Sequence, residues 1–262
     1  MADNSSPTSD GEAAFAALLE EARADPAVIG LVLGGSRGKG LETPLSDWDA
    51  YIVVTDEAFP AWSARFPGPT TGAADFHPIT LGEFARHAAW GGDTAFDRYS
   101  FVDMTAMVDK TGEVQRLIDE KGCVPGGEIS AFIHASLDHF INQVYRAAKC
   151  SRDGDAFAAR LEATEAVSPL LDALFALNGG RLRPFPKYLT RELLGQPLEA
   201  SPWTSEALRS EILRVLDGDI PALQAMLAAC EPLFRSAGYN DVFDAWGSGL
   251  AVAKGVAARG AA

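Results

Sequence analysis

Residues 28–54, VIGLVLGGSRGKGLETPLSDWDAYIVV, decide how we expect this chain to fold. The run from Val28 to Leu33 is short, apolar and rich in β-branched residues, which is typical of a buried strand. Gly34 and Gly35 follow it, and a second apolar run then opens with two acids. This order predicts a strand, a glycine turn and a second strand.

The turn and the two acids together predict a phosphate site beside a metal site. Glycines at the end of a strand let backbone N–H groups turn towards an anion, and the hydroxyl of Ser36 adds a donor. Asp47 and Asp49 are two residues apart, so we expect their carboxylates on one face of the second strand. Carboxylates that close repel each other unless a divalent cation lies between them. These are the parts needed for phosphoryl-group chemistry.

The two motifs, GGSRGKG followed by SDWDAYIVV, resemble the nucleotidyltransferase superfamily named for DNA polymerase beta. The expected order of elements is similar to the adenylyltransferases that modify kanamycin, streptomycin and lincosamides. The resemblance implies transfer of a nucleoside monophosphate from a nucleoside triphosphate, with ATP favoured, to a hydroxyl of a small molecule. It also implies Mg²⁺ as the cofactor and pyrophosphate as the product.

The same resemblance implies roles for individual residues of the first domain. Gly35, Ser36 and Arg37 would bind the outer phosphates of the nucleotide, and Asp47 and Asp49 would hold Mg²⁺. An exposed arginine after such a turn is as often only solvated, so the role of Arg37 stays open.

A third metal ligand is expected from a neighbouring strand. We favour Asp75, in the sequence ADFHPI, because it lies on the first strand predicted after the Asp-x-Asp strand. Asp103, in FVDMTAMV, is the alternative.

The general base is harder to assign. Related kanamycin-modifying enzymes carry a glutamate on the first helix of the C-terminal domain, where this chain has Asn142. Asp138 lies one turn earlier on that helix, and Glu165 and Asp172 lie on a second helix that is otherwise largely apolar. We favour Glu165 over Asp138, with a buried ion pair to an arginine as the rival explanation of the acids in the apolar helix.

A basic cluster, RLRPFPKYL and the arginine that follows at position 191, suggests a bound anion. By resemblance, Lys187 would hold the triphosphate, although a solvated basic surface would look the same. Because the first domain has few bases, we expect the two domains to contribute to one site.

The chain as a whole predicts an α+β fold with three parts. We expect residues 1–10 as a disordered tail, 11–126 as a nucleotidyltransferase domain with a mixed sheet, and 127–262 as an all-α bundle. The sequence CVPGGE, at residues 123–128, marks the boundary. We expect further strands over residues 73–80 and 99–108. Because the first of these contains Pro78, it should be short or lie at the edge of the sheet.

Composition and charge restrict the classes of partner that we expect this protein to bind. The formal net charge is −14, of which residues 1–128 carry −12 from 21 acids and 9 bases. Such a surface repels nucleic acid and attracts a cationic acceptor such as an aminoglycoside. There is no apolar run of 18 residues and no zinc-type spacing, and the three cysteines fit a reduced, cytoplasmic protein. The oligomeric state stays open.

Two other functions compete with the transferase. Gly34, Gly38 and Gly40, with Tyr145 and Lys149, match the glycine and Tyr-x-x-x-Lys patterns of short-chain dehydrogenases, which need a parallel sheet. The second alternative is a catalytically weak nucleotide-binding or antitoxin-like relative that kept only the fold.

Overall fold

The computed structural model describes residues 7–68 and 74–256. The chain forms two compact units, Met1–Cys123 and Val124–Ala262, which we call the N-terminal and C-terminal units and describe separately. Of the disordered tail expected over residues 1–10, residues 1–6 lie outside the described residues, whereas residues 7–10 belong to the first helix, which begins at Pro7. Across the described residues, no helix has the combination of length and apolar character needed to cross a bilayer.

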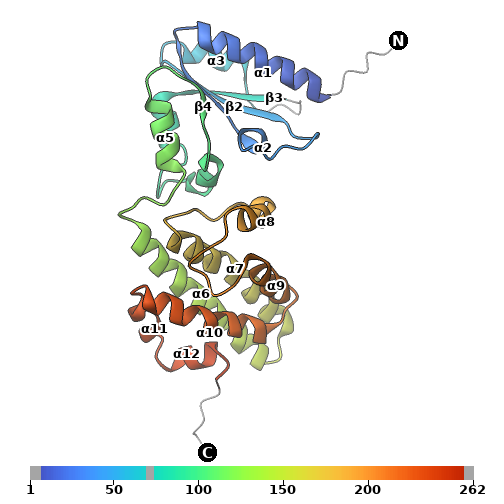
Figure 1. The fold of residues 1–262 in the computed structure, drawn as a ribbon, viewed down its shortest axis with the longest axis vertical. Coiled ribbons are helices and arrows are strands. Elements are labelled where there is room, and N and C mark those ends of the chain that lie inside the picture. The colour runs from blue at the N-terminus through green and yellow to red at the C-terminus, as the bar shows by residue number, and fades with distance from the viewer. Residues whose placement is uncertain (1–6, 69–73, 257–262) are drawn as a thin grey trace, which may run out of the picture. The chain divides into compact units, whose positions relative to one another are not determined.

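The N-terminal unit is a mixed sheet with helices on both faces (Figure 1). Strand β1 is antiparallel to β2 and β4, β2 is parallel to β3, and the order is β3-β2-β1-β4. The α+β class with a mixed sheet is therefore confirmed. Its elements are α1 Pro7–Ala24, β1 Val28–Leu33, α2 Gly35–Gly38, β2 Trp48–Val54, α3 Phe59–Arg65, β3 Ala74–Thr80, α4 Leu81–Arg86, the 3₁₀ helix η1 Ala95–Phe101, β4 Ala106–Asp109 and α5 Glu113–Lys121.

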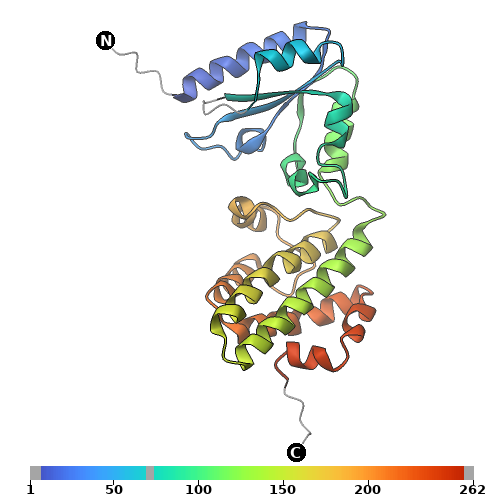
Figure 2. The ribbon, with the colours of Figure 1, turned by 180° about the vertical axis from the view of Figure 1, so that it is seen from behind.

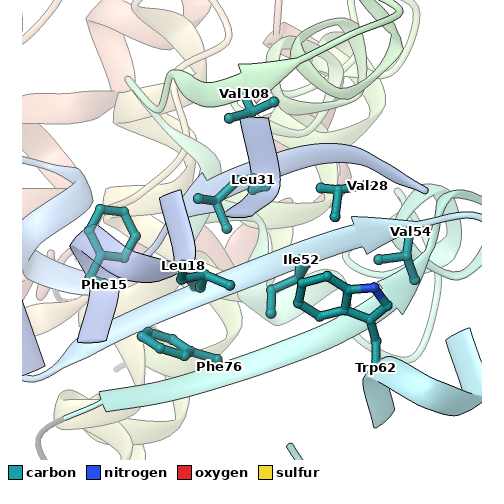
Figure 3. Close-up of a cluster of buried hydrophobic side chains, with 11 residues drawn as sticks. Phe15, Leu18, Val28, Leu31, Ile52, Val54, Trp62, Phe76 and Val108 are labelled. Atoms are coloured by element: carbon teal, nitrogen blue, oxygen red, sulfur yellow. The ribbon is translucent and has the colours of Figure 1, made fainter. Parts of the chain in front are cut away.

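The central strands are apolar throughout because both of their faces are covered. On one face a core joins the sheet to α1 and α3, with Phe15, Leu18 and Trp62 packed around Ile52 (Figure 3). On the other face Val53 belongs to a second core with residues of α4, α5 and η1. The alternation along β2 therefore sorts its side chains between the two faces, and Asp49 falls on the face of Val53.

Strand β3 lies at one edge of the sheet, as its proline predicts. Pro78 is in register with Ile52 of β2, and a proline lacks only the N–H that an edge strand does not need on its open side.

The last strand differs from expectation. Residues 99–108 do not form one strand, since η1 runs to Phe101 and β4 begins at Ala106.

Local hydrogen bonding explains that difference. Ser100 Oγ donates to Asp97 Oδ1 at 2.6 Å inside η1, and such short side-chain contacts favour turns over ladders. Asp103 then adopts a left-handed conformation with φ 56°, which ends the 3₁₀ segment before β4. The apolar residues Tyr99 and Phe101 are buried from a helical turn rather than from a strand.

Every element of the C-terminal unit within its described residues is a helix, as expected. Helices α6 and α7 run side by side along most of their length in both views (Figures 1 and 2). Its helices are α6 Ile129–Arg152, α7 Ala156–Leu177, α8 Pro186–Gly195, α9 Ser205–Leu216, α10 Ile220–Ser236, α11 Asn240–Ala245 and α12 Ser248–Ala253. The sequence reading missed α11 and α12, because six residues are too few to display a helical period.

Candidate functional site

The glycine turn folds directly onto one carboxylate. Gly34 N–H donates to the backbone oxygen of Asp49 at 2.7 Å, which joins the end of β1 to the start of β2. Gly35 has φ +59°, and a Cβ atom there would lie 2.6 Å from Asp49 Oδ2. Both the backbone conformation and the space therefore require glycine at position 35. The turn and Asp49 form one local structure, in which backbone N–H groups and a carboxylate lie side by side.

A second acid lies beside Asp49. Asp75 of β3 is paired with Asp49 in the parallel register, so both side chains are on the same face of the sheet. The Asp75 side chain is 17% exposed, and its Oδ2 lies 3.3 Å from His77 Nε2. Its other oxygen, Oδ1, is buried and has no hydrogen-bond partner among the described residues. An unpaired buried carboxylate oxygen is costly unless something binds it, so this atom fits a cation.

Asp47, which was expected to bind the metal together with Asp49, is placed differently. Strand β2 begins at Trp48, so Asp47 precedes the strand and is exposed. Its backbone oxygen accepts a hydrogen bond from Arg37 Nε at 3.0 Å. Within residues 7–68 and 74–256, no three His, Cys, Asp or Glu side chains are grouped to hold a metal ion. The structure thus places Asp49 and Asp75 together and leaves Asp47 outside the strand that carries Asp49.

Ser36 and Arg37 both bind the loop that leads into β2. Ser36 Oγ donates to Ser46 Oγ at 2.8 Å, and Arg37 Nη2 donates to the Ser46 backbone oxygen at 2.8 Å. The Arg37 guanidinium also lies 4.3 Å from the ring centroid of Trp48. Arg37 therefore holds residues 43–48 against the glycine turn, a role that the sequence reading did not assign to it.

The other candidate for the third carboxylate lies elsewhere. Asp103 is exposed, in the left-handed turn between η1 and β4, and does not lie on a strand.

A chain of polar side chains, which no sequence pattern indicates, adjoins this face of the sheet. Tyr51, two residues after Asp49, has its hydroxyl 3.1 Å from His87 Nε2. The same nitrogen lies 3.0 Å from Asp97 Oδ2, and Asp97 Oδ1 accepts from Ser100 Oγ. The four residues come from β2, the end of α4 and η1. Their spacing in the sequence is irregular, so only the folded chain brings them together.

Burial and hydrogen bonds shift two pKa values in this chain. Burial, and after it the charges of Asp97 and Asp49, raise the pKa of Tyr51, which keeps its hydroxyl protonated. Burial alone would raise the pKa of Asp97, but the hydrogen bonds from His87 and Ser100 outweigh it and lower that pKa. Asp97 is therefore ionised at neutral pH.

In the C-terminal unit, the two acids of α7 have different surroundings. Glu165 lies on α7, which was expected to be largely apolar, but its side chain is exposed. Asp172 is the buried acid: its Oδ1 accepts from Arg183 Nε at 2.7 Å, while burial raises its pKa despite that partner. Arg183 lies in the loop that follows α7 and reaches back to Asp172 on that helix.

The other predicted residues of this unit lie on α6 and α8. Asp138 is exposed on α6 and accepts a hydrogen bond from Trp246 Nε1 at 3.0 Å. Asn142 is half-buried on the same helix. Lys187 is exposed at the start of α8, with its ammonium 4.8 Å from the ring centroid of Tyr188, and its phosphate role stays a prediction.

Arginines of the basic cluster have acidic partners within their own unit. Arg183 pairs with Asp172, and Arg181 Nη2 lies 3.5 Å from Glu192 Oε2. Much of the clustered charge is therefore neutralised locally, which favours a structural role for these two arginines.

The dehydrogenase alternative does not fit the fold. A dinucleotide-binding fold needs a doubly wound parallel sheet, whereas here β1 is antiparallel to both of its neighbours. Tyr145 and Lys149 belong to α6 of the all-helical unit, where the Lys149 ammonium lies 5.2 Å from the Tyr145 ring centroid. The two residues thus lie one helical turn apart, in a unit whose described elements include no strand for a dinucleotide-binding sheet.

A scan against protein-family models finds no match, and neither does a search of the curated proteins. Among solved structures, the chain is similar to a nucleotidyltransferase-like protein from Exiguobacterium sibiricum, with 14% sequence identity and a TM-score of 0.41. The match covers 86% of this chain and 79% of that one.

Proposed function

We propose that the N-terminal unit carries a Mg²⁺-dependent nucleotidyltransferase site, which moves a nucleoside monophosphate, with ATP as the favoured donor, to a hydroxyl of a small molecule. The observation that carries the proposal is the glycine turn folded against Asp49, with Asp75 in register beside it. Backbone donors for phosphate next to paired carboxylates for a divalent cation are what phosphoryl transfer requires.

Each residue has a defined part in this proposal. Asp49 and Asp75 would hold Mg²⁺ through carboxylate oxygens, the ligands that this ion prefers, and Asp47 would complete the set from its position before β2. The bound ion would supply the positive charge that offsets the phosphates. Backbone N–H groups of the turn at Gly35 and Ser36 would orient the phosphates, while Arg37 keeps the turn in place.

The acceptor is proposed from charge. The first 128 residues carry a net −12, so a cationic hydroxylated molecule is attracted to this half of the chain, whereas a nucleic acid is repelled. An aminoglycoside has both properties, which makes antibiotic modification the first activity to examine.

Metal-dependent ATP binding tests the proposal. We expect the protein to bind ATP in calorimetry with Mg²⁺ present and to lose most of that affinity in EDTA. Asp49→Asn should abolish pyrophosphate release, because the substitution removes the charge that faces the turn. Binding of ATP that ignores the metal, or no binding at all, would contradict the proposal.

Two matched substitutions test the metal ligands. Asp75→Asn should lower pyrophosphate release by about 10²-fold or more, since it removes a ligand charge while keeping the shape. Asp103→Asn is the control, because that carboxylate is exposed in a turn and should leave the rate within about twofold of the wild type. The reverse ranking would move the metal site away from β3.

A nucleotide-binding protein without transfer is the second candidate. The observation in its favour is that Asp47 stands outside β2, so the described carboxylates form a pair and not a trio. Such a protein would bind Mg²⁺ and ATP but release no pyrophosphate with kanamycin, streptomycin, lincomycin or glycerol as acceptor.

A further inference from the structure

His87 has the surroundings of an oriented imidazole base. Its Nε2 lies 3.0 Å from Asp97 Oδ2, and the ionised Asp97 can only accept a hydrogen bond, so Nε2 carries the proton. Ser100 Oγ, 2.6 Å from the other oxygen of Asp97, fixes the carboxylate in turn. Tyr51 Oη lies 3.1 Å from the same ring nitrogen.

This leaves Nδ1 as the basic atom of the ring. In the part of the chain that the structure describes, no group forms a hydrogen bond to Nδ1 of His87. A carboxylate that accepts from one imidazole nitrogen holds the ring in one tautomer and stabilises the imidazolium formed when the other nitrogen takes a proton. The His87 side chain is 22% exposed, so a ligand can reach it.

The backbone beside His87 is held in an uncommon conformation. Ala88 has φ 53° although it is not glycine, and it is fully buried. Its N–H donates to Thr94 Oγ1 at 2.8 Å, and its carbonyl accepts from the buried Arg98 at 2.9 Å. Left-handed alanine costs free energy and persists only where surrounding contacts enforce it, which is common at functional sites. Here those contacts fix the direction in which the His87 side chain leaves the chain.

His87 also belongs to the same unit and the same sheet face as the two paired carboxylates. Its partner Tyr51 is two residues after Asp49 on β2, and alternate residues of a strand are roughly 7 Å apart on one face. His77, on that face of β3, has its ring centroid 6.0 Å from that of Tyr51. The place of His87 relative to Asp49 is therefore set by the N-terminal unit alone.

We propose that His87, oriented by Asp97, accepts the proton of the hydroxyl that attacks the nucleotide, an inference that rests on the function proposed above. His87 Nδ1 takes the proton as the acceptor oxygen forms a bond to the α-phosphorus. The bond from that phosphorus to the bridging oxygen breaks, and its electron pair leaves with pyrophosphate. The imidazolium then returns its proton to water. This assigns the base to the N-terminal unit and not to Asp138 or Glu165.

Charged and polar groups surround the ring from three elements. Tyr51 contacts it from β2 and Asp97 from η1, while Lys121 of α5 contacts Phe101, whose ring packs against His87. A base must be neutral to accept a proton, so the ring would act in its uncharged form.

Substitution of His87 by glutamine removes the proton acceptor while keeping a hydrogen-bond donor to Asp97. In His87→Gln the amide still donates to Asp97, but the side chain cannot accept a proton. We expect kcat for pyrophosphate release from Mg²⁺ and ATP, with water, glycerol, kanamycin and streptomycin as acceptors, to fall by ~10²–10⁴-fold. The KM for ATP should stay within about twofold, because the site of the phosphates is untouched.

The control is a similar pair in the C-terminal unit. His134 Nε2 lies 3.2 Å from Asp241 Oδ2 in an exposed pair, and His134→Gln should leave kcat unchanged. A His87→Gln enzyme with wild-type kcat would overturn the proposal while leaving the transferase function standing. A wild-type protein that releases no pyrophosphate would overturn both.

An NMR measurement tests the proposal without turnover. It uses the wild-type protein first, so it remains decisive even if the His87→Gln variant does not fold. In long-range ¹H–¹⁵N spectra of the wild-type protein, the neutral His87 ring should carry its proton on Nε2 and not on Nδ1. Asp97→Asn should weaken that preference, since an amide can donate a hydrogen bond as well as accept one. A neutral ring found protonated at Nδ1 would remove the basic atom and overturn the proposal.

Discussion

Gly35 shows how a single residue joins fold to chemistry. Its positive φ forms the turn after β1, and its missing side chain leaves room for Asp49 Oδ2. Gly40 has nearly the same φ, +62°, but no atom lies within 4 Å of where its Cβ would be. A comparison of substitutions at these two positions therefore distinguishes the effect of backbone strain from that of steric contact with the carboxylate.

Alanine at these two positions should have different effects. Gly40→Ala should lower the free energy of unfolding by about 1–2 kcal/mol, the cost of a left-handed non-glycine residue. Gly35→Ala should cost more and should also prevent binding of Mg²⁺ and ATP, because the methyl group displaces the carboxylate of Asp49. Urea unfolding and calorimetry measure both effects. Equal costs with unchanged ATP binding would show that Asp49 does not depend on the turn.

At this scale, sequence reasoning reached part of the candidate site. The spacing of Gly35 and Asp49 was informative because both belong to one strand–turn–strand unit with a fixed period. Arg37 and His87 could not be read in the same way. The partners of Arg37 are backbone carbonyls, which have no sequence signature, and those of His87 lie 36 residues before it and 10 after it.

At the scale of elements, long apolar segments were predicted well and short polar ones were not. Helix α7 was expected as a second, largely apolar helix, and its 22 residues form one continuous helix. The prediction of a strand over residues 99–108 was wrong. A hydrogen bond to the Asp97 side chain and the left-handed backbone of Asp103 determine the conformation of this segment, and neither produces a periodic sequence pattern.

Helix α5 carries a buried cation without a carboxylate partner in the contacts described for it. The Lys121 ammonium donates to the Phe84 backbone oxygen at 2.6 Å and lies 3.8 Å from the centroid of the Phe84 ring. Burial, and after it the nearby charge of Arg98, lowers the pKa of Lys121 to about 8. Since the unfolded chain keeps the ordinary value of 10.5, it binds more protons than the folded chain between those two values.

Stability of the N-terminal unit should therefore rise with pH in that window. We expect a gain of about 1–2 kcal/mol between pH 7.5 and 9.5, measured by hydrogen exchange of α5 and β4 amides in urea. The window ends below the range where Tyr51, with its raised pKa, would begin to oppose the gain. Lys121→Met should flatten the dependence, because it keeps the packing and removes the titrating group. An unchanged slope in that variant would assign the effect to another residue.

At the scale of the whole chain, each unit has its own core. Both hydrophobic clusters around the sheet are built from residues between Phe15 and Ile118, all within the N-terminal unit. In the C-terminal unit, α7 supplies a separate buried set that includes Leu170 and Leu174. Composition predicted this change of architecture, because strands and helices alternate only before the Pro–Gly segment.

Unfolding should therefore proceed in two transitions, one for each core. Ile52 and Leu174 are both fully buried, and truncation of either to alanine removes a comparable apolar volume. Ile52→Ala should destabilise the N-terminal transition by about 2–5 kcal/mol, whereas Leu174→Ala should act similarly on the C-terminal one. Each variant is the control for the other, with hydrogen exchange of segments from β2 and α7 as the measurement. A single transition that both substitutions lower equally would mean that the two cores fold as one cooperative structure.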